Sequence, residues 1–214
     1  MGEALRLCDR YVSEVVLAFG LCPWAEGVLR AGGLARRVLP GRNPLPAECL
    51  PIIDEWSGDR TTAGGGGADR AAIDIGFIIL PLRAGSSGSF DSFAEAVRRV
   101  DRARRTREQP PPFVIAAFHP EGAQRFEGPH QLVSFVRRTP DPLLQLVRAE
   151  LLDRVKIAAP GVSEQIAERN FATLRDPAAT ARFDAAVRDI RADRDRTYAA
   201  LGAAPPPPMV LPSG

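Results

Sequence analysis

The chain has 214 residues, of which 45% are hydrophobic and 25% are charged, and its formal net charge is +2. This length and composition predict one globular domain over residues 1–202 with a single sizeable core. The apolar runs are too short for a membrane-spanning helix, and the acidic residues among the first twenty argue against a signal peptide. We therefore expect a cytoplasmic protein with no membrane partner.

Nearly all basic residues are arginines, and Lys156 is the only lysine, a bias typical of a GC-rich bacterium. The arginines between positions 98 and 107 are therefore interpreted as a solvated helix face. Acidic residues nearly balance the basic ones, and no aromatic residues are interleaved for stacking on bases. We expect no nucleic-acid partner.

The N-terminal part begins with an amphipathic helix. Residues 2–19 place apolar side chains at i, i+3 and i+4 spacings, and Gly20 and Pro23 end this helix. A short strand is expected at 34–39 and a weak helix at 46–56.

The central part is predicted to be a βαβ unit. Residues 58–72 contain four consecutive glycines and are expected to form a flexible loop, which lacks the Lys-Ser/Thr ending of a phosphate-binding P-loop. Residues 72–82 and 110–120 are short apolar runs typical of buried strands, and residues 90–107 form an amphipathic helix between them. A right-handed crossover would make the two strands parallel.

The C-terminal half is predicted to be helical. Residues 121–141 are irregular, residues 142–155 and 164–174 are expected to be helices, and Asp176 is the expected N-cap of a last helix. The composition of residues 203–214 predicts a disordered tail. The expected fold class is α/β or α+β, with a small, mainly parallel sheet built around the βαβ unit and helices packed on it.

His119 is the first candidate for chemistry. It lies at the carboxyl end of a predicted buried strand, where open α/β sheets place their ligands. The alternative is a histidine that only hydrogen-bonds the backbone. The other histidine, His130, lies in a Gly-Pro-His turn and is expected at the surface.

Cys22 is the second candidate. It follows the predicted end of the first helix, and Pro23 restricts it to an extended conformation. The three cysteines form no CxxC pair, which argues against a disulfide framework or a Cys-rich zinc site. Cys22 is either a reactive thiol or a small apolar side chain that seals a helix end.

The segment RRTPDP, residues 137–142, is a candidate anion site. Arg138 precedes a predicted helix start that Thr139 or Asp141 could cap, and free N–H groups beside an arginine favour a carboxylate or phosphate. The alternative is a capped helix with solvated arginines.

The segment AERNFATL, residues 167–174, places a polar side chain on an apolar stripe. Asn170 shares a helix face with Ile166 and Leu174, so its amide needs partners, and Arg169 is its neighbour. A buried structural asparagine is the alternative.

Four segments carry a family resemblance: LCPWAEGVLR (21–30), AAFHPE (116–121), RRTPDP (137–142) and ERNFATL (168–174). The order and spacing of these segments resemble those of a bacterial family catalogued as domain of unknown function 1415. The resemblance covers about residues 5–175. The matching positions are Cys22, Pro23, His119, Pro120, Phe126, Arg138, Pro140, Pro142, Glu168, Arg169 and Asn170. The chain departs from the family pattern at residues 134–137 and at Gln145, where the family has a histidine. The family brings no activity, so the resemblance leaves the reaction open.

Three functions remain open from the sequence. The first is an enzyme, a thiol- or histidine-dependent transferase or hydrolase acting on a small carboxylated or phosphorylated metabolite. Its catalytic candidates are Cys22, His119 and Asn170, and its substrate-binding candidates are Arg138, Arg169, Thr139 and Glu168. The second is a metal- or haem-binding protein that uses Cys22 and His119. The third is a non-catalytic small-ligand binding module. The sequence indicates neither a cofactor nor an oligomeric state.

Overall fold

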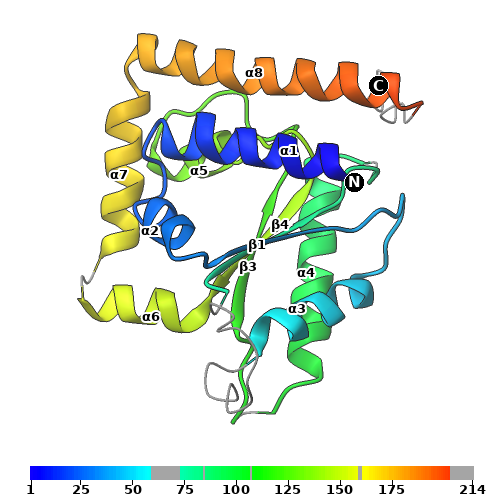
Figure 1. Cartoon of the computed structure of the whole chain (residues 1–214). Coiled ribbons are helices and arrows are strands. Elements are labelled where there is room, and N and C mark those ends of the chain that lie inside the picture. The colour runs from blue at the N-terminus through cyan, green and yellow to red at the C-terminus, as the bar shows by residue number, and fades with distance from the viewer. Residues whose placement is uncertain (59–72, 84, 107, 159–160, 203–214) are drawn as a thin grey trace, which may run out of the picture.

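The central sheet is mixed, and its strand order is β1-β2-β4-β3 (Figure 1). The computed structural model describes residues 1–58, 73–83, 85–106, 108–158 and 161–202. In this part of the chain the strands are β1 (Leu34–Val38), β2 (Ile75–Ile79), β3 (Phe113–Phe118) and β4 (Leu143–Arg148). β1 pairs in parallel with β2, whereas β4 runs antiparallel to both β2 and β3. β2 and β3 therefore run parallel to each other, but β4 lies between them.

The α/β class is confirmed, but the prediction of a mainly parallel sheet is wrong. Residues 142–155 do not form one helix, because β4 precedes a separate helix, α6 (Ala149–Ala158). β4 is buried on both faces, so its apolar residues follow one another without alternation. A short run of this kind does not distinguish a buried strand from a buried helix. The predicted βαβ unit would pair β2 directly with β3, but β4 lies between them.

Helices cover both faces of the sheet and one of its ends (Figure 1). In chain order they are α1 (Gly2–Tyr11), the π-helical segment η1 (Val12–Leu17), α2 (Ala25–Arg30), the 3-10 helix η2 (Pro46–Cys49), α3 (Leu50–Ser57), α4 (Ser87–Ala103), α5 (Pro129–Val136), α6, α7 (Val162–Leu174) and α8 (Pro177–Ala200). The predicted helices at 2–19, 46–56, 90–107 and 164–174 correspond to α1 with η1, η2 with α3, α4 and α7.

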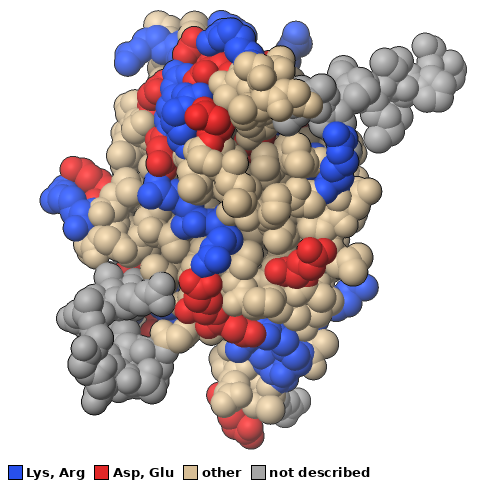
Figure 2. All heavy atoms as spheres, turned by 45° about the vertical axis from the view of Figure 1, so that its right-hand side comes forward, with Lys and Arg blue, Asp and Glu red and all other residues tan. Residues whose placement is uncertain are grey.

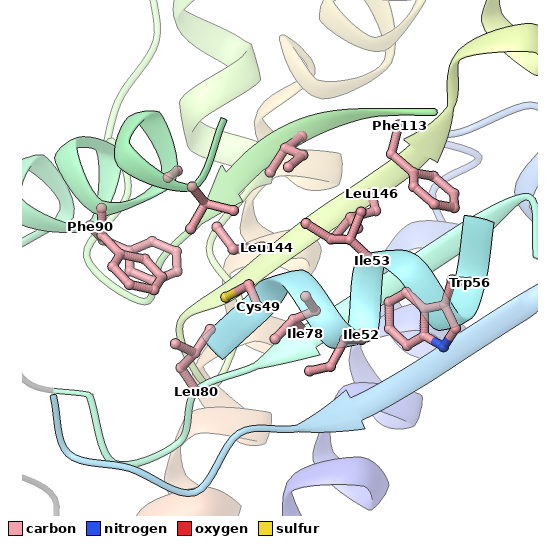
Figure 3. Packing of buried hydrophobic residues seen from close by; sticks show 14 residues of the cluster. Cys49, Ile52, Ile53, Trp56, Ile78, Leu80, Phe90, Phe113, Leu144 and Leu146 are labelled. Atoms are coloured by element: carbon pink, nitrogen blue, oxygen red, sulfur yellow. The ribbon is translucent and has the colours of Figure 1, made fainter. Parts of the chain in front are cut away.

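One face of the sheet packs against α3 and α4. Figure 3 shows Ile53 and Trp56 of α3 against Ile78 of β2 and Leu146 of β4. The Trp56 ring lies directly over the backbone of Gly76, where a Cβ atom would be only 2.4 Å from the ring. β2 therefore needs a glycine at this position to let the indole approach.

The opposite face packs against α1, η1 and α2. Cys8, Val12 and Val28 from these helices form one buried cluster with Ile75 and Phe77 of β2. The two faces thus have separate apolar cores, and the sheet lies between them.

α8 lies beside α1 at the end of the sheet (Figure 1). Asp176 caps α8 as predicted, because its carboxylate accepts a hydrogen bond from the Ala179 N–H at 2.9 Å. Arg6 and Arg10 of α1 both form ion pairs with Asp193 of α8, at 2.7 and 2.6 Å. On the face shown in Figure 2, basic and acidic side chains are interleaved and do not separate by sign.

Residues 121–141 are not wholly irregular, because α5 begins within them at Pro129, a residue well suited to the first helical turn. Gly58 apart, the predicted loop at 58–72 lies outside the described residues, and so does the predicted tail at 203–214. None of the helices that the structure describes is long and apolar enough to cross a membrane.

Candidate functional site

His119 directly follows β3 and packs against the first turn of α4. Its side chain is buried, with the residue only 8% exposed, and its ring centroid lies 5.7 Å from that of Phe90 in the first turn of α4. The Nδ1 atom accepts a hydrogen bond from the Glu121 N–H at 3.1 Å. A second hydrogen bond joins the imidazole to the backbone of Gly85, just before α4. Nδ1 is thus the unprotonated nitrogen, and Nε2 carries the proton.

Two arginines from distant parts of the chain reach the same place. Arg83 follows β2, and its guanidinium lies 4.1 Å from the centroid of the Phe93 ring. Arg191 lies on α8 and donates to the carbonyl of Pro120, the residue after His119, at 3.4 Å. The ends of β2 and β3 and the middle of α8 therefore meet around His119.

The environment of His119 favours the neutral imidazole. Burial, together with the positive charges of Arg191, Arg83 and Arg194, lowers the pKa of His119 to about 4. The hydrogen bond to Gly85 opposes this shift. An anion placed among these arginines would cancel much of their effect and raise the pKa again.

Arg194 is neutralised by a buried carboxylate. Its Nε donates to Asp141 at 2.6 Å, and the hydroxyl of Tyr198 donates to the other carboxylate oxygen at 2.6 Å. Asp141 is 1% exposed, and burial raises the pKa of its carboxyl, although Arg194 and Tyr198 oppose the rise. This triad fixes α8 to the start of β4.

Arg83 and Arg191 are different, because neither forms an ion pair within the described part of the chain. The Nε atom of Arg83 is buried and has no hydrogen-bond partner there. Burial also lowers the pKa of the Arg83 guanidinium. Two uncompensated cations therefore flank a buried, neutral histidine.

Arg138 and Thr139 are tied to the protein itself. Arg138 is 5% exposed, donates to Asp184 at 2.5 Å and to the Phe135 carbonyl at 2.9 Å, and stacks on the Phe135 ring. The Thr139 hydroxyl donates to the carbonyl of Asp141 at 2.7 Å. No helix starts after Asp141, because β4 follows it. The geometry thus gives both residues structural partners in place of the anion expected for RRTPDP.

Cys22, Arg169 and Asn170 form a second group. The Asn170 amide donates to the Leu21 carbonyl at 2.9 Å, and Arg169 donates to the Gly20 carbonyl at 2.6 Å. These bonds attach α7 to the turn that carries Cys22. Burial raises the pKa of the Cys22 thiol, while the charge of Arg169 and the backbone of Trp24 and Ala25 oppose the rise.

The structure separates Cys22 from His119. Cys22 lines a cavity against the face of β2 that carries Phe77, whereas His119 packs on Phe90 of α4, the helix on the opposite face. Asn170 does not orient His119, because its amide is bound to Leu21. Glu168 is exposed on α7. Within the described ranges, no three His, Cys, Asp or Glu side chains converge as a metal-ligand set.

The sequence predicts His119 at a strand end but does not predict the arginines around it. Arg83 follows a predicted strand of the same βαβ unit as His119, so the rule that placed His119 at the carboxyl edge could also have placed Arg83 there. Arg191 had no such signal, because its position depends on how α8 packs across the sheet end.

Comparison with known proteins gives one match. A family model described as "Protein of unknown function (DUF1415)" matches residues 66–182. Neither the curated proteins nor the solved structures contain a match to the chain. The matched segment includes Arg83, His119 and the whole of α4 between them.

Proposed function

The chain belongs to the DUF1415 family of proteins of unknown function, and we propose that it is an enzyme whose site lies at the carboxyl ends of β2 and β3. The substrate is a small carboxylated or phosphorylated molecule. Arg83 and Arg191 bind its anionic group, and His119 exchanges a proton with it.

The observation that carries this proposal is the buried Nε of Arg83, which has no hydrogen-bond partner among the described residues. A buried donor without an acceptor costs about 1–3 kcal/mol. An anion beside Arg83 would remove this cost and would also compensate the charge of Arg191. A planar guanidinium is well suited to this task, because it donates two parallel hydrogen bonds to a carboxylate or a phosphate.

The anion would also prepare His119 for chemistry. The pKa of His119 is about 4, so the imidazole is neutral at pH 7. A bound anion offsets the charges of Arg83 and Arg191, and the pKa then rises toward the range in which a histidine can act as general acid and base. Binding and proton uptake are therefore coupled.

This proposal changes the thiol mechanism expected from the sequence. Cys22 lies on the other face of the sheet, and burial keeps its thiol protonated. The described geometry offers it no imidazole partner, so His119 acts alone. A metal or haem held jointly by Cys22 and His119 is disfavoured for the same reason.

Calorimetric titration with inorganic phosphate and with succinate tests the site. We expect Arg83→Gln to weaken binding about tenfold, or ~1.4 kcal/mol. Arg99→Gln is the matched control, because it removes the same charge from an exposed position on α4. Absence of binding, or equal losses in the two variants, would contradict the proposal.

Proton uptake separates the enzyme from a non-catalytic binding module. Titrations near pH 5.5 in buffers of different ionisation enthalpy measure the protons taken up with the anion. We expect uptake in the wild type and none in His119→Gln. Binding without proton uptake in the wild type would favour the binding module.

A further inference from the structure

A second cavity lies on the face of the sheet away from His119. Its enclosed volume is about 40 Å³, within about 460 Å³ of space that includes the mouth open to solvent, and it lies between η1, α2 and the strands β2 and β4. Its walls are mainly apolar and include Val12, Val16, Phe77 and Phe118. Mainly apolar walls with a few polar groups are typical of binding sites for small molecules, and the small enclosed volume restricts this one to a small molecule.

The cavity follows from the local backbone. In η1 the helix widens to a π-helix, with the Ala18 N–H bonded to Ser13 and the Leu21 N–H bonded to Val16, five residues back. Such segments are rare and frequent at functional sites. Gly20 then turns the chain with a φ of +60°, and Pro23 leads into α2. The wall of the cavity is therefore set by the end of the first helix.

Besides Tyr11, whose hydroxyl donates to the Val136 carbonyl, two polar side chains line this apolar space. Cys22 lines the cavity from the turn before α2, and Gln145 lines it from the middle of β4, in register with Phe77. The Gln145 amide forms no hydrogen bond with the described residues, although the residue is partly buried. Among the residues that the structure describes, no acidic or basic side chain lines the cavity.

We propose that this cavity binds a small, uncharged and largely apolar molecule that carries one hydrogen-bonding group. The apolar part contacts Val12, Val16 and Phe77. The polar group pairs with the Gln145 amide and lies beside the Cys22 thiol. An ionised ligand is excluded because nothing in the lining compensates its charge. This site therefore differs from the anion site around His119 in position and in chemistry.

Protection of Cys22 from alkylation reports on the cavity. Cys8 and Cys49 are 2% and 0% exposed, so N-ethylmaleimide modifies Cys22 first in the folded protein. Benzyl alcohol, which has an apolar ring and one hydroxyl, is expected to slow this reaction in a saturable manner. Inorganic phosphate is not expected to slow it.

Gln145→Leu tests the polar contact. We expect this variant to lose affinity for benzyl alcohol roughly five- to tenfold, while its affinity for toluene stays within about twofold. Val16→Phe fills the cavity and should abolish protection by both probes. Far-UV circular dichroism and a cooperative urea transition establish that each variant is folded. Alkylation of the wild type at the same rate with and without either probe would overturn the proposal.

Discussion

The rings of His119 and Phe90 lie with their centroids 5.7 Å apart and join the end of β3 to the first turn of α4. This contact buries the imidazole at the meeting point of two strand ends and α8. A buried imidazole among arginines is held neutral, and a neutral histidine beside uncompensated cations is prepared for an anion.

The protein should lose stability as the pH falls because of His119. The pKa of this group is about 4 in the folded protein and 6.5 for an ordinary histidine. Above pH 6.5 neither state is protonated, but between 6.5 and 4 the unfolded chain takes up a proton that the folded chain does not. The contribution of His119 to the free energy of unfolding should therefore fall over this window by roughly 3 kcal/mol, and this contribution should not change further below it.

Urea unfolding at half-unit steps of pH measures this loss. His119→Asn serves as the comparison. Only the slope of the free energy of unfolding against pH is compared, so a difference in absolute stability between the two proteins does not affect the result. We expect a shallower slope between pH 6.5 and 4 for the variant. Parallel curves for the two proteins would show that His119 is not the group responsible.

The buried Asp141 should be a major determinant of stability. Asp141→Ala removes the buried partner of Arg194 and of the Tyr198 hydroxyl and should destabilise the protein by about 3–5 kcal/mol in urea unfolding. Asp195→Ala is the matched control, since Asp195 also pairs with Arg194 but from an exposed position, and it should cost less than about 1 kcal/mol. Equal losses in the two variants would mean that the triad with Tyr198 does not hold α8 in place.

Gly76 should be intolerant of a side chain. In Gly76→Ala the new Cβ lies 2.4 Å from the Trp56 ring, so the indole must move and the protein should lose about 1–3 kcal/mol. Gly27→Ala in α2 has no atom within 4 Å of the new Cβ and should be neutral or stabilising by up to about 1 kcal/mol. Thermal unfolding compares the two, and an unchanged melting temperature for Gly76→Ala would refute the close approach.

Cys22 should react slowly at neutral pH. Burial raises the pKa of its thiol, so the rate of labelling with a disulfide reagent should still increase with pH above the ordinary range for cysteine. Gln145→His brings an imidazole into the same cavity and should increase the rate at pH 7. Gln145→Asn is the control, and an equal rate in both variants would place position 145 out of reach of Cys22.

The sequence predicted the helices more reliably than the sheet. The helix at 90–107 and the Asp176 cap were found because an apolar stripe and a capping side chain are local signals. The sequence predicts a helix where β4 lies, because a strand buried on both faces shows no alternation of apolar and polar residues. That error also hid the antiparallel pairing that separates β2 from β3.

The sequence predicts the place of a candidate site residue only where that residue follows a recognisable strand. His119 was placed at a strand end for a sound reason, and the structure puts it there. The sequence does not determine whether Cys22 lies beside His119. The face of the sheet to which a turn residue such as Cys22 points depends on tertiary packing. Arg138 and Asn170 are site candidates because of their sequence neighbours. Their hydrogen-bond partners, Asp184 and Leu21, are distant in sequence, so the sequence does not reveal these contacts.

The most direct test of the anion site follows the His119 ring by NMR from pH 3.5 to 8, with and without inorganic phosphate. His130 is exposed and lies outside the cluster, so its ring signals serve as the reference. We expect the pKa of His119 to be near 4 without phosphate and to rise by about one unit or more with it. A His119 titration that phosphate leaves unchanged at saturating concentration would contradict the account.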